Sequence, residues 1–337
     1  MEKLVYVDDS LPGITRKGAG RGFAYYSPEG DLIRDTGERD RLNAIALPPA
    51  YRDAWFCPAD NGHILATGYD DAGRKQYRYH PDFRRMKEGD KFDRCEAFGR
   101  LLPLIRARVD EDLSQPQPTE TRALASVVRL LDMSAIRIGN AYYAKSNESY
   151  GATTLLREHA QVNSRSVRLS FRGKGGRERE VRLDDPRLAR AIRRMNNLPR
   201  IKGGENLFRY RDEEGAIWAV DSNEVNAYLR DTMGEDFTAK HFRTWHASVI
   251  GFDTLVNGTG KVPIKQLLEM VAEHLGNTEA IARKSYIHPA VIARVEGQEQ
   301  WRSGLKLPRS NKWLTRQERG LLQLLETSPE AAKLLVA

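Results

Sequence analysis

The chain has 337 residues, which is more than one ordinary core requires and suits two domains. Its content of 40% hydrophobic and 30% charged residues is typical of a globular protein and excludes a disordered or fibrous chain. No run approaches the roughly eighteen apolar residues of a membrane span, and the first residues lack the order of a signal peptide, so we expect a cytoplasmic protein with no membrane partner.

Basic residues outnumber acidic ones by 54 to 46, which gives a formal net charge of +8. Many of them cluster in residues 157–182 and 187–200. Such a surplus suits a polyanionic partner, because each neutralised phosphate releases condensed counterions. Plenty of basic proteins bind no nucleic acid, so composition leaves both possibilities open.

The two cysteines, Cys57 and Cys95, are too few for a disulfide scaffold and do not have the spacing of a zinc site. We therefore expect both to be reduced residues that serve packing.

The first part of the chain, to about residue 86, is rich in short strand-like runs separated by turn residues. These runs occupy residues 22–26, 54–57 and 63–67. Aromatic or alternating stretches between turns favour a small antiparallel β domain. A helix is expected at residues 38–46.

The polar stretch at residues 84–91 has few side chains that could be buried, and we interpret it as a linker. The predicted domains are therefore residues 1–88, rich in β-strands, and residues 89–337.

Helical periodicity dominates after Phe92. Apolar residues recur at Leu124, Val127, Val128 and Leu131, behind a Thr-Glu-Thr that is suited to cap a helix. Further signals are the capping-box spacing at residues 221–224 and a glycine, Gly276, after a helix that begins near Pro263.

One sheet-like segment interrupts the helical pattern. Residues 166–171 alternate polar and apolar, residues 172–176 form a glycine-rich turn, and residues 178–183 return. Glycines supply the positive φ of a tight turn, so this is a predicted hairpin. The fold class is therefore α+β, with a small antiparallel β domain at the N-terminus and a larger, mainly helical domain that contains a small sheet.

Four local patterns in the second domain bring together residue types suited to phosphate chemistry. They are residues 134–140 (Ser-Ala-Ile-Arg-Ile-Gly-Asn), the hairpin tip with Lys174, residues 240–246 (Lys-His-Phe-Arg-Thr-Trp-His), and residues 274–277 running on to 285–289. In these patterns the sequence resembles the type IB DNA topoisomerases, specifically the poxvirus-like bacterial group, over nearly the whole chain. That family shares the order Arg, Lys, Arg, His or Asn, Tyr, and the nine-residue step from Asn277 to Tyr286 matches its spacing.

The resemblance implies an enzyme that relaxes supercoiled DNA by cutting and resealing one strand. It implies a catalytic domain with a three-stranded sheet, and the catalytic residues Arg137, Lys174, Arg243, Asn277 and Tyr286. Poxvirus and nuclear members place His at the position of Asn277, so only charge stabilisation, and not proton transfer, carries over to that residue.

The physical chemistry of these residue types agrees with those roles. Transfer of a phosphodiester to a phenol adds negative charge to the non-bridging oxygens, and the fixed guanidinium groups of Arg137 and Arg243 suit that charge. Asn277 would donate one more hydrogen bond.

Tyr286 is the predicted nucleophile and would form a 3′-phosphotyrosyl link, while Lys174 would protonate the departing 5′ oxygen. Because the covalent link conserves the bond energy, we expect no cofactor, ATP or metal.

Each residue also has a purely structural interpretation. Tyr286 could be a half-buried anchor, Arg137 a solvated charge, Arg243 one side of an ion pair, and Lys174 a solubilising surface residue. The four patterns together, in the family's order, favour catalysis.

In the first domain, residues 73–80 alternate basic, amide and aromatic side chains. On a strand, Gln76 would point to one side while Tyr77 and Tyr79 point to the other. Poxvirus relatives have a similar segment in the major groove, where Gln reads adenine edges, so all three are predicted to bind DNA. The alternative is that the tyrosines belong to a β core.

Asn140, Tyr142 and Tyr143 occupy positions that resemble a second DNA-facing segment of the family. Relatives have lysines at two of these positions. The expected partner is double-stranded DNA, bound by a monomer that closes around the duplex as a clamp.

Two alternatives remain. A tyrosine recombinase shares the catalytic fold and the covalent chemistry, but recombinases usually show His-x-x-Arg where this chain has Lys-His-Phe-Arg at residues 240–243. A DNA-binding protein without enzymatic activity would use its basic residues only to hold phosphates.

Overall fold

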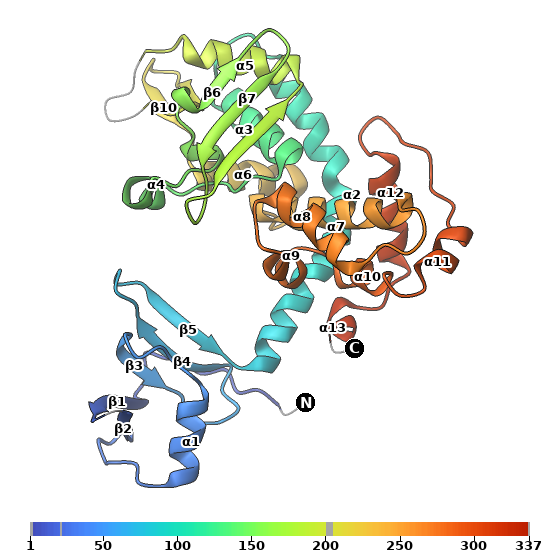
Figure 1. Ribbon diagram of the computed structural model, residues 1–337. Coiled ribbons are helices and arrows are strands. Elements are labelled where there is room, and N and C mark those ends of the chain that lie inside the picture. Colours follow the sequence, from blue (N-terminus) through green and yellow to red (C-terminus); the bar gives the residue numbers. More distant parts are fainter. Residues whose placement is uncertain (1–2, 21, 200–204, 336–337) are drawn as a thin grey trace. The chain divides into compact units, whose positions relative to one another are not determined.

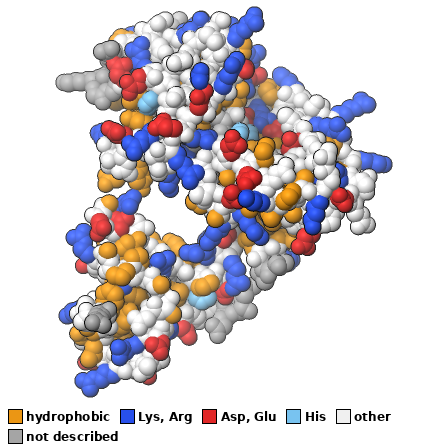
Figure 2. All heavy atoms as spheres, in the orientation of Figure 1, with side chains coloured by type: hydrophobic (Ala, Val, Ile, Leu, Met, Phe, Trp, Pro, Cys, Tyr) orange, Lys and Arg blue, Asp and Glu red, His pale blue; other side chains and the backbone are white. Residues whose placement is uncertain are grey.

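The computed structural model describes residues 3–20, 22–199 and 205–335 (Figure 1). Contacts between residues divide the chain into two compact units, Met1–Asp90 and Lys91–Ala337, called unit 1 and unit 2 below. Within the described ranges, no helix is long and apolar enough to cross a bilayer. On the face drawn in Figure 2, lysine and arginine side chains are spread over both units.

The described part of unit 1 is built on a five-stranded antiparallel sheet with the order β2-β1-β3-β4-β5. Its elements are β1 (Ile14–Ala19), β2 (Gly22–Tyr26), α1 (Thr36–Ala44), β3 (Arg52–Phe56), β4 (Ile64–Tyr69) and β5 (Lys75–Tyr79). Tyr25, Leu42 and Phe56 form the centre of a small core, in which the Tyr25 hydroxyl donates to Asn43 Oδ1 at 2.8 Å. The prediction of a small antiparallel β domain is confirmed.

Helix α1 spans Thr36–Ala44, whereas residues 38–46 were predicted, so both of its ends lie two residues earlier than expected. Asp35 is its N-cap and accepts a hydrogen bond from Glu38 N at 2.7 Å, so Glu38 is the third residue of the helix and not its first. Ala46 has a φ of 54° and lies outside the helix.

The predicted linker at residues 84–91 is wrong, because helix α2 (Pro81–Ser114) runs through it without a break. Phe92, Cys95 and Phe98 are buried and recur at helical spacing, while most of the charged residues before them on the same helix are exposed. An exposed helix face has the same polar composition as a linker, so composition alone could not separate the two.

Unit 2 is mainly helical (Figure 1). Its further helices are α3 (Glu120–Ser134), α4 (Ala141–Asn147), η1 (Ala152–Thr154), η2 (Arg157–His159), α5 (Pro186–Asn196), α6 (Ser222–Met233), α7 (Ala239–Asn257), α8 (Ile264–Leu275), α9 (Glu279–Ser285), α10 (Pro289–Ala293), α11 (Gln298–Gly304), α12 (Arg316–Glu326) and α13 (Ala331–Leu334). Its described strands form a three-stranded antiparallel sheet, β6 (Ala160–Val162), β7 (Val167–Arg172) and β8 (Glu178–Leu183), and a two-stranded one, β9 (Arg209–Arg211) and β10 (Ile217–Ala219). The predicted α+β fold class with a three-stranded sheet is confirmed.

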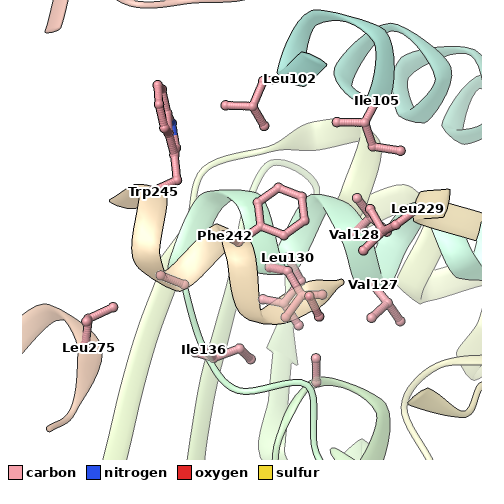
Figure 3. Packing of buried hydrophobic residues seen from close by; sticks show 14 of the residues in the cluster. Leu102, Ile105, Val127, Val128, Leu130, Ile136, Leu229, Phe242, Trp245 and Leu275 are labelled. Carbon is pink, nitrogen blue, oxygen red and sulfur yellow. The ribbon is translucent and has the colours of Figure 1, made fainter. Parts of the chain in front are cut away.

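The core of unit 2 is centred on helix α7. Phe242 and Trp245 are fully buried in one cluster with Leu102 and Ile105 of α2 and Val128 of α3 (Figure 3). Burial of such large side chains supplies about 1.5–3 kcal/mol each, so α7 is held firmly between its neighbours.

The predicted helix signals of unit 2 are confirmed. Thr119 caps α3 by accepting from Arg122 N, and Asp221 and Glu224 form a capping box at α6. Gly276 ends α8 in the left-handed conformation, with a φ of 61°. Cys57 and Cys95 are both free and buried, as expected.

Candidate active site

Arg137 lies on the loop that follows α3. The helix ends at Ala135 in the left-handed conformation, with a φ of 49°. The loop is then pinned, because Ala152 N donates to Arg137 O at 2.8 Å. A Cβ atom at Gly151 would lie 2.5 Å from Arg137 O, so the close approach of the two segments requires glycine.

Arg243 projects from the buried face of α7 and is 3% exposed. Its Nη1 donates to Ala135 O and its Nη2 donates to Leu275 O at 3.1 Å. The guanidinium thus joins the end of α3 to the end of α8, and because these two carbonyls are neutral they leave its positive charge uncancelled.

Asn277 follows the C-terminus of α8 and is 7% exposed. Arg137 Nη2 donates to Asn277 Oδ1, which fixes the orientation of the amide. The amide nitrogen, Nδ2, is then a buried donor with no partner among the described residues. A buried donor without a partner is costly, and an acceptor oxygen placed there by a ligand would satisfy it.

Tyr286 is the residue directly after α9, and its N–H donates to Ala282 O at 3.1 Å. The Arg243 guanidinium carbon lies 4.8 Å from the centre of the Tyr286 ring. Lys91 Nζ donates to the preceding carbonyl, Ser285 O, at 2.8 Å. Lys91 of α2 therefore holds the backbone next to Tyr286, and Arg243 of α7 packs against its ring.

The electrostatics of this cluster favour a phenolate. Burial would raise the pKa of Tyr286, but the charge and hydrogen bond of Arg243, with the charges of Arg137 and Lys240, lower that pKa below its ordinary value. Burial, followed by the charge of Arg243, lowers the pKa of Arg137 to about 10, so Arg137 stays charged at neutral pH.

Lys174 is exposed at the tip of the β7–β8 hairpin, where Gly175 and Gly176 have φ values of 75° and 73°. In the described part of the chain it makes no hydrogen bond or ion pair. The structure thus brings together four of the five predicted residues, Arg137, Arg243, Asn277 and Tyr286, and leaves Lys174 without a bonded contact to them.

Two arginines of the same hairpin, Arg177 and Arg179, were not predicted from the sequence. Arg177 Nη1 donates to Asn277 O at 2.9 Å, and Arg179 donates to the last carbonyls of α8. Their only signal in the sequence is membership of the basic cluster at residues 157–182. Together with Arg137 and Arg243 they form a group of arginines that, over the described ranges, has no carboxylate partner.

The predicted DNA-binding residues of β5 are accessible in unit 1. Tyr77 and Tyr79 are 39% and 37% exposed, and their rings are stacked with centres 5.6 Å apart. Gln76 is half-buried, and its Nε2 donates to Asp70 Oδ2 at 3.0 Å. The tyrosines therefore do not belong to the β core, which was the alternative.

In unit 2, Asn140 is the N-cap of α4 and accepts a hydrogen bond from Tyr142 N at 2.9 Å. Tyr142 and Tyr143 are 57% and 40% exposed. Asn140 thus has a structural partner, while the two tyrosines present aromatic surface to solvent.

Comparisons with known proteins agree over most of the chain. The family model for the catalytic core of eukaryotic DNA topoisomerase I matches residues 80–301, and that for the N-terminal domain of bacterial DNA topoisomerase IB matches residues 22–70. DNA topoisomerase 1B of Acanthamoeba polyphaga mimivirus is 29% identical over 291 residues, which are 82% of this chain and 85% of that protein. DNA topoisomerase 1B of vaccinia virus (strain Western Reserve) is 22% identical over 242 residues, 69% of this chain and 73% of the viral one.

Among solved structures, the XerH site-specific recombinase bound to its difH substrate is 15% identical, with a TM-score of 0.35. The similarity covers 65% of this chain and 55% of the recombinase. The family model for the catalytic core of DNA topoisomerase I matches residues 80–301, which are more than half of this chain. The chain therefore belongs to the type IB DNA topoisomerases.

Proposed function

We propose that this topoisomerase relaxes supercoiled DNA by cutting one strand through a 3′-phosphotyrosyl intermediate and resealing it, without ATP or metal. The observation that carries the proposal is the position of the Arg243 guanidinium, 4.8 Å from the centre of the Tyr286 ring, in a cluster that also contains Arg137 and Asn277.

In the first step the Tyr286 oxygen attacks the phosphorus, and the bond from phosphorus to the 5′ oxygen breaks. The lowered pKa of Tyr286 increases the fraction of phenolate at a given pH, which favours this attack. Arg137, Arg243 and the free Nδ2 of Asn277 donate to the non-bridging oxygens as their charge grows.

Lys174 supplies the proton that the departing 5′ oxygen takes up. Its exposed position on a glycine-rich turn, without a bonded partner, leaves the ammonium group available to a bound strand. Religation is the reverse: the 5′ hydroxyl returns its proton to Lys174 and attacks the phosphorus, and the Tyr286 phenolate leaves.

We further propose a monomer that binds double-stranded DNA with both units, as a clamp, in the cytoplasm. The net charge of +8 suits phosphate contacts. The exposed aromatic residues Tyr77, Tyr79, Tyr142 and Tyr143 offer contacts to bases or sugars.

The test is a relaxation assay on negatively and positively supercoiled plasmid, in excess chelator and without nucleotide. Wild-type protein should relax both substrates in steps of one linking number, and Tyr286→Phe should lose the activity while it stays folded. Tyr26→Phe, a change of the same kind outside the cluster, should relax both as wild type does. No relaxation by folded wild-type protein would refute the proposal, and activity only on DNA with paired specific sites would indicate a recombinase.

A further inference from the structure

The hairpin that carries Lys174 is bound to the C-terminus of α8 through Arg179 of β8. Arg179 Nη1 donates to Glu273 O at 3.0 Å, and Nη2 donates to His274 O at 2.7 Å. These carbonyls belong to the last turn of α8, where helical hydrogen bonds run out and a cation is favoured. One planar side chain thus binds two carbonyls of this last turn, of which Glu273 O also accepts from Gly276 N at 3.2 Å.

The Arg179 side chain is enclosed by two glycines that sit at functional positions. A Cβ atom at Gly173, the residue before Lys174, would lie 3.1 Å from Arg179 Cγ. A Cβ atom at Gly276, the residue before Asn277, would lie 2.7 Å from Arg179 Nη1. Arg179 therefore packs directly between the chain segments that present Lys174 and Asn277.

A third hydrogen bond also joins the hairpin to the chain after α8: Arg177 Nη1 donates to Asn277 O at 2.9 Å. Neither arginine has a carboxylate partner in the ranges that the structure describes. Their bonded partners are the carbonyls at the end of α8, so the two side chains have no competing ion pair that would hold them elsewhere.

We propose that Arg179 is a positioning residue that docks the β7–β8 hairpin onto the end of α8 and so sets where Lys174 meets the 5′ oxygen. This inference rests on the acid role proposed for Lys174. The sheet itself does not depend on Arg179, because Val167, Leu169 and Phe171 of β7 are buried in the core of unit 2. Loss of the arginine should therefore loosen the hairpin tip and leave the fold intact.

The experiment measures single-turnover cleavage by wild type, Arg179→Met, Arg179→Lys and Lys174→Ala. Each protein is given a normal phosphodiester and a matched strand with sulfur in place of the 5′ bridging oxygen, because a thiolate leaves without a proton. A displacement of about 1 Å can cost roughly 100-fold in rate, so Arg179→Met should cut the normal strand about 100-fold more slowly than wild type. It should cut the sulfur-containing strand at nearly the wild-type rate, as Lys174→Ala should.

Two controls define the effect. Arg182→Met removes the same charge from the same strand, but Arg182 is exposed and contacts Asp184 rather than α8, so its rates should equal those of wild type. Arg179→Lys keeps the charge and loses the two-pronged contact, so it should fall between wild type and Arg179→Met, and it remains informative if the methionine variant unfolds.

The possible results separate the two ideas. Equal slowing of Arg179→Met on both strands would mean that Arg179 acts on the phosphate and not through Lys174, and an unchanged rate would mean that the hairpin is placed without it. Either result overturns the inference while Lys174→Ala is rescued by sulfur. If Lys174→Ala is not rescued, the acid role itself fails, and the inference fails with it.

Discussion

Arg177, Arg179 and Arg243 of this cluster are held by backbone carbonyls rather than by carboxylates, and Arg137 is held by the side-chain amide of Asn277. Arg243 donates to Ala135 O and Leu275 O, and Arg179 donates to Glu273 O and His274 O. A carbonyl orients a guanidinium without neutralising it, whereas an ion pair would cancel its charge. The site is therefore rigid and strongly positive, which suits the binding of one phosphate and the ionisation of one phenol.

The first prediction concerns the ionisation of Tyr286. Because Arg243, Arg137 and Lys240 outweigh the effect of burial, Tyr286 should ionise below the ordinary tyrosine pKa of about 10. The measurement is the tyrosinate absorbance of wild-type protein minus that of Tyr286→Phe as the pH rises. Burial raises the pKa of Tyr25, Tyr79, Tyr210 and Tyr228, so these residues ionise later. A difference curve with its midpoint at or above about 10 would contradict the electrostatic account.

The sequence predicted those residues of the cluster that lie in short, recognisable patterns of neighbouring residues. Arg137, Arg243, Asn277 and Tyr286 lie together although they come from four separate segments, and the roles proposed for them stay predictions. Arg179 was not found, because a contact with carbonyls at the end of another helix has no periodicity or motif in the sequence. Such a contact becomes visible only when the hairpin and α8 are placed in space.

At the scale of elements, a buried network ties α12 to the helices that carry the site. Arg106 of α2 binds Asp132 of α3 through Nε at 2.8 Å and Glu318 of α12 through Nη2 at 2.7 Å. Trp245 of α7, half a turn beyond Arg243, donates to Glu318 Oε1 at 3.1 Å. Helix α12 thus contributes to holding α7 in place.

The second prediction is that Arg106→Met strongly destabilises the protein. Asp132 and Glu318 are 9% and 4% exposed, and the change removes the guanidinium that both carboxylates share, so that Asp132 keeps only His246 Nε2, at 3.5 Å, as an ion-pair partner among the described residues. Removal of one side of a buried pair costs about 3–5 kcal/mol, to be measured as the loss in free energy of unfolding in urea. Arg100→Met is the matched control, because Arg100 binds Glu96 and Glu326 on the exposed side of the same helix and should cost less than about 1 kcal/mol. Equal losses for the two variants would contradict the importance of the network.

Elements with strong local signals were predicted well, and those defined by context were not. The hairpin of β7 and β8 and the end of α8 at Gly276 follow from alternation and from glycine chemistry. Residues 84–91 are predicted to be a linker because their side chains are polar, yet they form about two turns of α2 in which most side chains are exposed. Whether a polar stretch is a linker or part of a helix depends on whether the residues next to it, here Phe92 and Phe98, are buried. Burial of these residues depends on the tertiary structure, which the sequence pattern does not show.

At the scale of the whole molecule, the chain combines an antiparallel β unit with a mainly helical unit, each with its own core. The division between them falls at Asp90, inside α2, and the boundary predicted from the sequence is residue 88. The residues proposed for cleavage all lie in unit 2, and unit 1 contributes the exposed tyrosines of β5. The proposed reaction therefore depends on one residue of unit 2, Tyr286.

The covalent complex with Tyr286 can be trapped directly. Wild-type protein is mixed with duplex DNA and denatured rapidly, and the peptide that retains nucleotide is identified by mass spectrometry. We expect a nucleotide joined through its 3′ phosphate to Tyr286, and no adduct in Tyr286→Phe. An adduct on another residue, or one formed through a 5′ phosphate, would contradict the proposed reaction.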